Sequence, residues 1–138
     1  MRLRHNQKVD LIQGVPLFSK LSGSGLREVA KIADEIDLPE GKTLTKEGDR
    51  GREFFVLLDG TAEVRKKGRK INTLKQGDFF GEIALVTKMP RTATVTTTSP
   101  TRALVITERD FSALLKRSPL IGQGVVQALG ERLAPDLS

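Results

Sequence analysis

The sequence predicts an α+β fold in which helices precede and follow a double-sheet β-jelly-roll. Between residues 42 and 108, short β-type runs alternate with glycines, whereas apolar residues on both sides of this region recur at helical spacing. Evenly spaced short strands with glycine corners are typical of a closed roll rather than a flat sheet. With 138 residues and no internal repeat, the chain is expected to form a single domain over residues 1–138.

Residues 1–40 are assigned to N-terminal helices. The basic stretch 1–14 lacks the apolar centre of a secretory signal and is expected to begin a helix. Ser24 is expected to cap a second helix, whose apolar residues recur at the spacing of one helix face: Leu26, Val29, Ala30 and Ala33.

The roll is expected to occupy residues 41–107. Its strands are predicted from β-rich runs separated by glycine-containing turns: Thr43–Lys46, Glu53–Leu58, Thr61–Lys66, Lys70–Leu74, Thr92–Thr98 and Arg102–Thr107. The basic run Arg65–Lys70 surrounds Gly68 between two of these strands. This composition favours a solvated hairpin turn over a nucleic-acid contact.

Residues 108–134 are expected to form two C-terminal helices, a hinge and a lid. Thr107 and Asp110 have the spacing of a capping box, with aspartate where glutamate or glutamine is commoner. Pro119 is expected to begin the final helix, and Pro135 to stop it.

Composition argues against several classes of function. The chain has no cysteine, which excludes disulfides and thiolate chemistry, and no apolar run approaches the ~20 residues of a membrane span. The only histidine, His5, lies outside the roll, so neither a metal site rich in histidine nor a Ser-His nucleophile is expected. We therefore expect no catalytic residues, no metal, no cofactor and a cytoplasmic location.

Residues 80–95, FGEIALVTKMPRTATV, contain the parts of a site for a phosphate and a sugar. Gly81 lets the backbone approach a ligand because it has no Cβ. The turn that begins with Ile83 and Ala84 offers unpaired N–H donors, and Arg91 adds a permanent charge on a planar set of donors. Glu82 can accept hydrogen bonds from ribose hydroxyls. A phosphate and a sugar diol in one site indicate a cyclic nucleotide.

The pattern F-G-E-x-A-L followed by P-R-x-A-T-V resembles the phosphate-binding cassette of the cyclic nucleotide-binding domain family. This family includes protein kinase A regulatory subunits, the catabolite activator protein and cyclic-nucleotide-regulated channels. The resemblance covers residues 14–134 and includes the glycines at barrel corners. It implies a cupin-like roll with a short phosphate-binding helix, cAMP or alternatively cGMP as ligand, and a signal transmitted by movement of the C-terminal helices.

The resemblance extends to residues beyond the core of the cassette. Thr92 and Ala93 follow the arginine, and a threonine at this place in some relatives reaches a guanine or the phosphate. Strand alternation, however, places Thr92 on the opposite face from Arg91. Val64 is expected in the core, where correspondence with the channel domains allows contact with the base.

Arg132 is the informative residue of the final helix. It continues an apolar stripe with the residues at helical spacing before it, Ile121, Val125 and Ala128. An arginine in the last helix of the channel family caps the purine, and the alternative is an arginine that snorkels near a helix C-terminus.

Other classes of function fit the sequence less well. A net charge of +6 suits a DNA-binding regulator, but no helix-turn-helix unit follows the final helix. An enzyme on a cupin-like roll lacks metal ligands, and a roll that has lost nucleotide binding would not need an intact cassette. The expected partners are a cyclic nucleotide and a protein effector, without direct nucleic-acid contact or a membrane segment.

Overall fold

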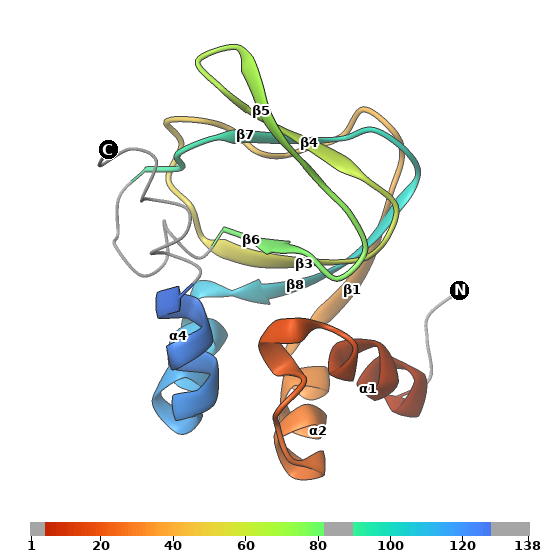
Figure 1. The fold of residues 1–138 in the computed structure, drawn as a ribbon, viewed down its shortest axis with the longest axis vertical. Coiled ribbons are helices and arrows are strands. Elements are labelled where there is room, and N and C mark those ends of the chain that lie inside the picture. Colours follow the sequence, from red (N-terminus) through yellow and green to blue (C-terminus); the bar gives the residue numbers. More distant parts are fainter. Residues whose placement is uncertain (1–4, 82–89, 128–138) are drawn as a thin grey trace. The chain divides into compact units, whose positions relative to one another are not determined.

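The structure, a computed structural model, describes residues 5–81 and 90–127 (Figure 1). The chain divides into two compact units, a helical unit built from its N-terminal and C-terminal segments and a strand unit of residues 33–108. The short phosphate-binding helix expected after Gly81 lies outside the described residues.

The helical unit contains α1 (His5–Gln13), the 3-10 helix η1 (Pro16–Phe18), α2 (Gly23–Ile32) and α4 (Glu108–Arg117), and residues 119–127 are also helical. The expected helix near the N-terminus and the two expected C-terminal helices are therefore confirmed over the described residues. Apolar side chains from each of these segments, and Val15 between α1 and η1, are buried: Ile12, Val15, Phe18, Leu26, Val29, Ala30, Phe111, Leu114, Ile121 and Val125.

The N-terminus of α2 differs from the expectation by two residues. Ser22, not Ser24, is the capping residue, because its hydroxyl accepts a hydrogen bond from the Gly25 amide at 3.2 Å. Ser24 lies in the first turn, with its hydroxyl 3.1 Å from that of Ser22. Both serines precede the same apolar stripe, so composition alone did not distinguish the cap from its neighbour.

The strand unit is the predicted double-sheet roll. Its two four-stranded antiparallel sheets have the strand orders β1-β8-β3-β6 and β2-β7-β4-β5. The strands are β1 (Asp34–Leu38), β2 (Thr43–Thr45), β3 (Glu53–Asp59), β4 (Ala62–Lys66), β5 (Arg69–Leu74), β6 (Phe79–Phe80), β7 (Thr94–Thr97) and β8 (Thr101–Thr107).

Both sheets contribute inward-facing side chains to one apolar core, and Figure 1 shows the sheets facing each other. The Phe55 and Phe80 rings stack with centroids 4.9 Å apart, which joins β3 to β6. The buried residues of this core cluster are Phe55, Leu57, Ala62, Leu74, Phe80, Val95 and Ala103. This core holds the two sheets together and fixes the positions of the loops at their ends.

Two strands were not predicted. β1 falls in the stretch assigned to the N-terminal helices, because three of its five residues, Asp34, Glu35 and Asp37, are acidic and poor strand formers. Its apolar residues, Ile36 and Leu38, nevertheless pack against the core cluster. β6 has only two residues, which is too short for a periodic pattern.

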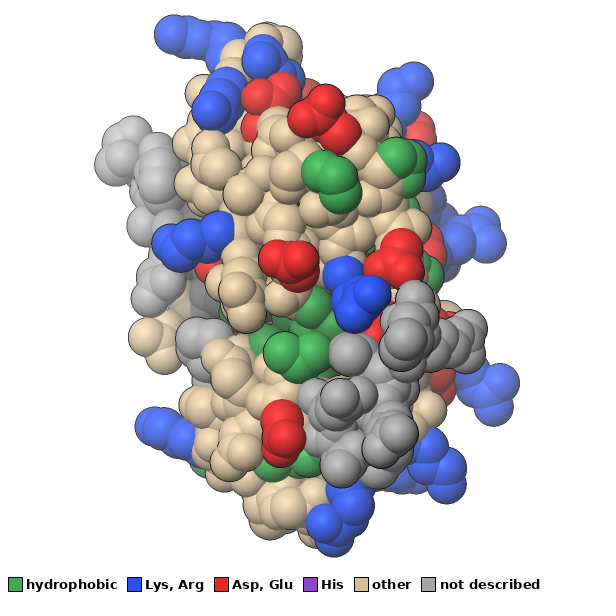
Figure 2. Space-filling view, turned by 90° about the vertical axis from the view of Figure 1, so that its right-hand side faces the viewer, with side chains coloured by type: hydrophobic (Ala, Val, Ile, Leu, Met, Phe, Trp, Pro, Cys, Tyr) green, Lys and Arg blue, Asp and Glu red, His purple; other side chains and the backbone are tan. Residues whose placement is uncertain are grey.

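The hairpin between β4 and β5 confirms the turn expected around Gly68. Lys67 and Gly68 have φ values of 53° and 76°, as a tight two-residue turn between antiparallel strands requires. Figure 2 shows basic side chains projecting at the top of the view, where this hairpin lies in Figure 1, with acidic side chains beside them. Such mixed charge fits a solvated surface.

β5 is an edge strand of its sheet, and its sequence limits further pairing. The Thr73 amide donates to the Asn72 side-chain oxygen at 2.8 Å, so one backbone donor is already satisfied within the strand. Arg69 and Lys70 at its start are exposed and positively charged. No helix in the described part of the chain has the length and hydropathy needed to cross a membrane.

The Asp37–Arg102 pair between β1 and β8 predicts a specific pH response. A hydrogen bond from Arg102 Nε at 3.0 Å holds the pKa of the Asp37 carboxyl below its usual 3.8. A carboxyl whose pKa is lower in the folded than in the unfolded protein stabilises the fold at pH values above its unfolded-state pKa. This stabilisation is lost as the pH falls through its folded-state pKa. Carbon chemical shifts of Asp37 should therefore titrate below pH 3.8 in the wild type.

The variant Arg102→Gln should raise the pKa of Asp37 toward its ordinary value, because the charged donor is lost. The Glu63 carboxyl is the internal control, since its pKa is lowered by a hydrogen bond from a different residue, Arg65. Unchanged titration of Asp37 in Arg102→Gln would contradict the assignment.

Candidate functional site

The candidate site is centred on Arg91, a charged residue with only 8% of its surface exposed. Its Nη1 atom donates to the Gly81 carbonyl at 3.0 Å, and its Nη2 atom donates to the Glu53 carbonyl at 2.7 Å. Gly81 directly follows β6, and Glu53 begins β3. The guanidinium is therefore held at the ends of two strands that pair with each other.

The backbone of Arg91 is fixed by the turn of residues 46–49. The Arg91 amide donates to the Asp49 carbonyl at 2.7 Å, and the Gly48 amide donates to the Arg91 carbonyl at 2.9 Å. The turn is closed by a hydrogen bond from the Asp49 amide to the Lys46 carbonyl at 3.0 Å. Main chain and side chain of Arg91 are thus held from different parts of the roll, which limits the directions in which the guanidinium can point.

The Gly81 and Glu53 carbonyls orient the guanidinium. An arginine side chain carries its charge at every physiological pH, and its planar set of N–H donors suits phosphate oxygens. The arrangement is chemically suited to an anion with several acceptor atoms.

Gly81 is required by the packing around Arg91. Its φ of +98° is a conformation that residues with side chains rarely adopt. A Cβ at this position would lie 2.8 Å from Arg91 Nη1 and 2.8 Å from the Glu53 carbonyl oxygen. Gly81 is expected from the sequence to allow the approach of a ligand, and the structure adds its close contact with Arg91.

Thr92 and Ala93 are half-buried and precede β7, which begins at Thr94. The expectation that alternation separates Thr92 from Arg91 therefore does not apply, because these two residues are not in a strand. The Ala93 carbonyl accepts a hydrogen bond from the Thr45 hydroxyl at 3.2 Å. This contact ties the segment after Arg91 to β2.

Val64 is half-buried and packs against the core cluster, where it pairs with Val95 of β7. This confirms its expected place in the core. The other expected site residues, Glu82, Ile83, Ala84 and Arg132, lie outside the described residues. The structure therefore brings together Gly81, Arg91, Thr92 and Ala93 from the expected set.

Sequence reasoning missed Glu53 and the turn of residues 46–49 as supports of the site. The turn was noticed only as a glycine corner of the roll, and its contact with Arg91 depends on tertiary structure. Glu53 contributes a backbone carbonyl, which any residue could provide, so its identity carries no signal. Within residues 5–81 and 90–127 no group of carboxylates and histidines could hold a metal ion.

Comparison with known proteins places the chain among cyclic nucleotide-binding domains, whose sequence profile matches residues 35–118. The chain is 40% identical over 123 residues to a cAMP-dependent protein kinase regulatory subunit of Mycosarcoma maydis, covering 80% of this chain and 22% of that protein. It is 30% identical over 132 residues to a putative potassium channel protein of Rhodopseudomonas palustris, covering 93% of this chain and 32% of that protein. The chain thus spans about a fifth to a third of the length of these relatives.

A solved structure of a cAMP-bound protein kinase A regulatory chain has the same fold. The TM-score is 0.80 with 27% sequence identity, and the match covers 91% of this chain and 47% of that chain.

The contact between Gly81 and Arg91 predicts that Gly81→Ala costs more stability than backbone strain alone. Gly41 is a matched control, because its φ is +84° but nothing lies within 4 Å of its missing Cβ. Gly41→Ala should lower the free energy of unfolding by about 1–2 kcal/mol through strain. Gly81→Ala should lose more than this in chemical denaturation, since Arg91 must also move. Equal losses for the two variants would show that the close packing has no energetic effect.

Proposed function

The chain belongs to the cyclic nucleotide-binding domain family, and we propose that it binds a cyclic nucleotide, cAMP, at a site centred on Arg91. The observation that carries this proposal is the buried Arg91 guanidinium, oriented by the Gly81 and Glu53 carbonyls. The cyclic phosphate carries one negative charge and two free oxygens, which match a charged planar donor set.

Residues around Arg91 are proposed to contact the remaining parts of the ligand. Gly81 and the turn that contains Ile83 and Ala84 supply backbone N–H groups for the phosphate. Glu82 accepts a hydrogen bond from the free 2′-hydroxyl of the ribose. Thr92 and Ala93 line the phosphate side, and Val64 lies where a base enters the roll.

The choice of cAMP over cGMP is supported by the relatives, which include a cAMP-dependent kinase subunit and a cAMP-bound regulatory chain. The second candidate is cGMP, and the observation in its favour is Thr92. Its side chain is half-buried directly after Arg91, and its hydroxyl is a donor and acceptor that a guanine amino group can use.

The proposed role is regulatory rather than catalytic. The nucleotide is expected to bind one arrangement of the C-terminal helices more tightly than another and so to shift the population between them. The surface that is exposed in the favoured arrangement would then be recognised by a protein effector. A location in the cytoplasm, where cyclic nucleotides act, accompanies this proposal.

Calorimetry with cAMP, cGMP and 5′-AMP tests the function. The wild type should bind cAMP, and Arg91→Ala should weaken binding by about 30-fold to several thousand-fold, because removal of one partner of a buried charge pair costs roughly 2–5 kcal/mol. Arg102→Ala removes the same charge from the roll at an ion pair with Asp37 and should bind normally.

A loss below about fivefold in Arg91→Ala would remove the arginine from the site, since fivefold is only about 1 kcal/mol. Failure of the folded wild type to bind either cyclic nucleotide would overturn the proposed function itself.

The final helix is proposed to act as a lid that is stabilised by the nucleotide through Arg132. Gly122 and Gly124 lie in the helical residues 119–127, and each lowers intrinsic helix stability by about 1 kcal/mol relative to alanine. Leu17 packs closely against Gly124, because a Cβ atom at position 124 would lie only 2.6 Å from Leu17 Cδ1. The helix therefore depends on docking more than on propensity.

Amide exchange in residues 119–127 should slow when cAMP saturates the protein, and Arg132→Ala should reduce both the affinity and this protection. Arg117→Ala is the control, because Arg117 pairs with Glu28 within the helical unit. Equal exchange with and without saturating ligand would exclude a lid, and the signal would leave the site by another route.

A further inference from the structure

Glu47 connects the turn that holds Arg91 to the tip of the β4–β5 hairpin. Its Oε1 atom accepts a hydrogen bond from the Lys67 amide at 2.9 Å, across 20 residues of sequence. Its own amide donates to the Thr94 hydroxyl at 2.9 Å, at the start of β7. The neighbouring residues Gly48 and Asp49 make the two backbone hydrogen bonds that fix Arg91. We call this series of contacts the Glu47 bridge.

Lys67 occupies a backbone conformation that is costly for lysine. Its φ of 53° makes it the only non-glycine residue with positive φ in the described ranges, at a place where asparagine or glycine is usual. A conformation of this kind is unfavourable for a residue with a side chain and persists only where neighbouring contacts favour it. The Glu47 carboxylate is such a contact, since it binds the Lys67 amide.

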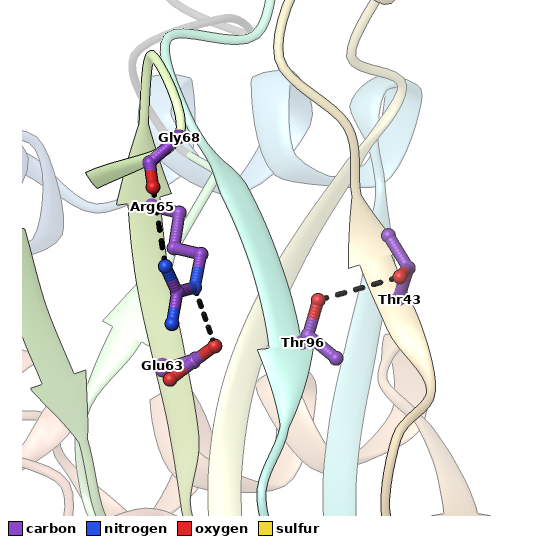
Figure 3. A network of polar contacts seen from close by, with 5 residues as sticks. All are labelled: Thr43, Glu63, Arg65, Gly68 and Thr96. Atoms are coloured by element: carbon purple, nitrogen blue, oxygen red, sulfur yellow. Dashed lines mark hydrogen bonds and ion pairs between the residues drawn. The ribbon is translucent and has the colours of Figure 1, made fainter. Parts of the chain in front are cut away.

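Arg65 also holds the hairpin tip, from within the hairpin itself (Figure 3). The Arg65 Nη1 atom donates to the Gly68 carbonyl at 3.2 Å, while its Nε atom donates to Glu63 Oε1 at 2.6 Å. The Glu63–Arg65 pair stays within the hairpin and does not reach the turn of residues 46–49. The Glu47 carboxylate, in contrast, joins the Lys67 amide at the tip to the turn that holds Arg91.

We propose that Glu47 is a positioning residue that couples the conformation of the β4–β5 hairpin tip to ligand binding at Arg91. This inference rests on the proposed function, because it assigns that site a second structural connection besides the C-terminal helices. A ligand that fixes Arg91 also fixes the turn of residues 46–49 and, through Glu47, the Lys67 amide. Coupling between two sites is reciprocal, so a tip held in place increases the affinity for the nucleotide.

The hairpin tip is a suitable place for such a connection to end. Lys67, Arg69 and Lys70 are exposed, so a change in the tip alters a positively charged surface. Ligand binding would then change the surface of the roll at a place that is distant in sequence from the final helix.

Three variants separate coupling from simple loss of charge. Glu47→Ala removes the acceptor, Glu47→Gln keeps a neutral acceptor, and Asp37→Ala removes an equal charge from the Arg102 ion pair, outside the hairpin and the Glu47 bridge. Thermal unfolding confirms that each variant is folded. NMR amide exchange at Lys67 and calorimetry with cAMP are then measured for the wild type and all three variants.

In the wild type, cAMP should slow exchange of the Lys67 amide. Glu47→Ala should abolish this slowing and weaken cAMP binding by about 2- to 10-fold, the effect of one lost hydrogen bond. Glu47→Gln should restore most of both effects, and Asp37→Ala should leave both unchanged. Wild-type affinity in Glu47→Ala together with continued protection of Lys67 by cAMP would overturn the proposal.

The same variants distinguish failure of this inference from failure of the proposed function. If the wild type binds no cyclic nucleotide, the proposed function fails, and the Glu47 bridge is judged in the protein without ligand. There, Glu47→Ala should accelerate exchange of the Lys67 and Arg91 amides, whereas Asp37→Ala should leave the Arg91 amide unchanged. Identical Arg91 exchange in the two variants would overturn the coupling.

Discussion

The structure of the site depends on the cost of placing an arginine charge at the end of a roll whose interior is apolar. A buried guanidinium must have hydrogen-bond partners, and two backbone carbonyls provide them from strand ends that are already fixed by sheet pairing. This arrangement explains why the residue at position 81 is glycine and why the turn of residues 46–49 lies against the arginine. Each feature holds the cation in one orientation before any ligand arrives, so a ligand does not have to order it.

The roll supplies this orientation through its topology rather than through specific side chains. β3 carries the Glu53 carbonyl and also the most continuous run of buried residues, so the support of the cation is as rigid as the core itself. Threonine hydroxyls perform a similar role on the other sheet. Thr45 and Thr94 bind main-chain groups that flank the site, and Thr43 and Thr96 lie side by side on that sheet (Figure 3).

Much of the fold could be predicted from the sequence because its strands are bounded by glycine and contain β-branched or aromatic residues. β1 could not be predicted, because the acidic residues on both sides of Ile36 resemble a polar loop. It becomes a strand only through its pairing with β8. For the site, Arg91 and Gly81 were recognisable from residue type and spacing. The partners of Arg91 were not, because a backbone carbonyl leaves no trace in the sequence, and contacts such as Glu47 to Lys67 arise only when the roll closes.

The edge strand β5 has a consequence for the behaviour of the protein in concentrated solution. Two copies that approach with these edges parallel would bring Arg69 and Lys70 of each copy together, and the Thr73 amide is already occupied by Asn72. Repulsion between these cations acts over a Debye length of about 10 Å at 0.1 M salt and about 3 Å at 1 M. Colloidal stability along this edge is therefore electrostatic and decreases as salt is added, even though the fold itself is held together by apolar contacts.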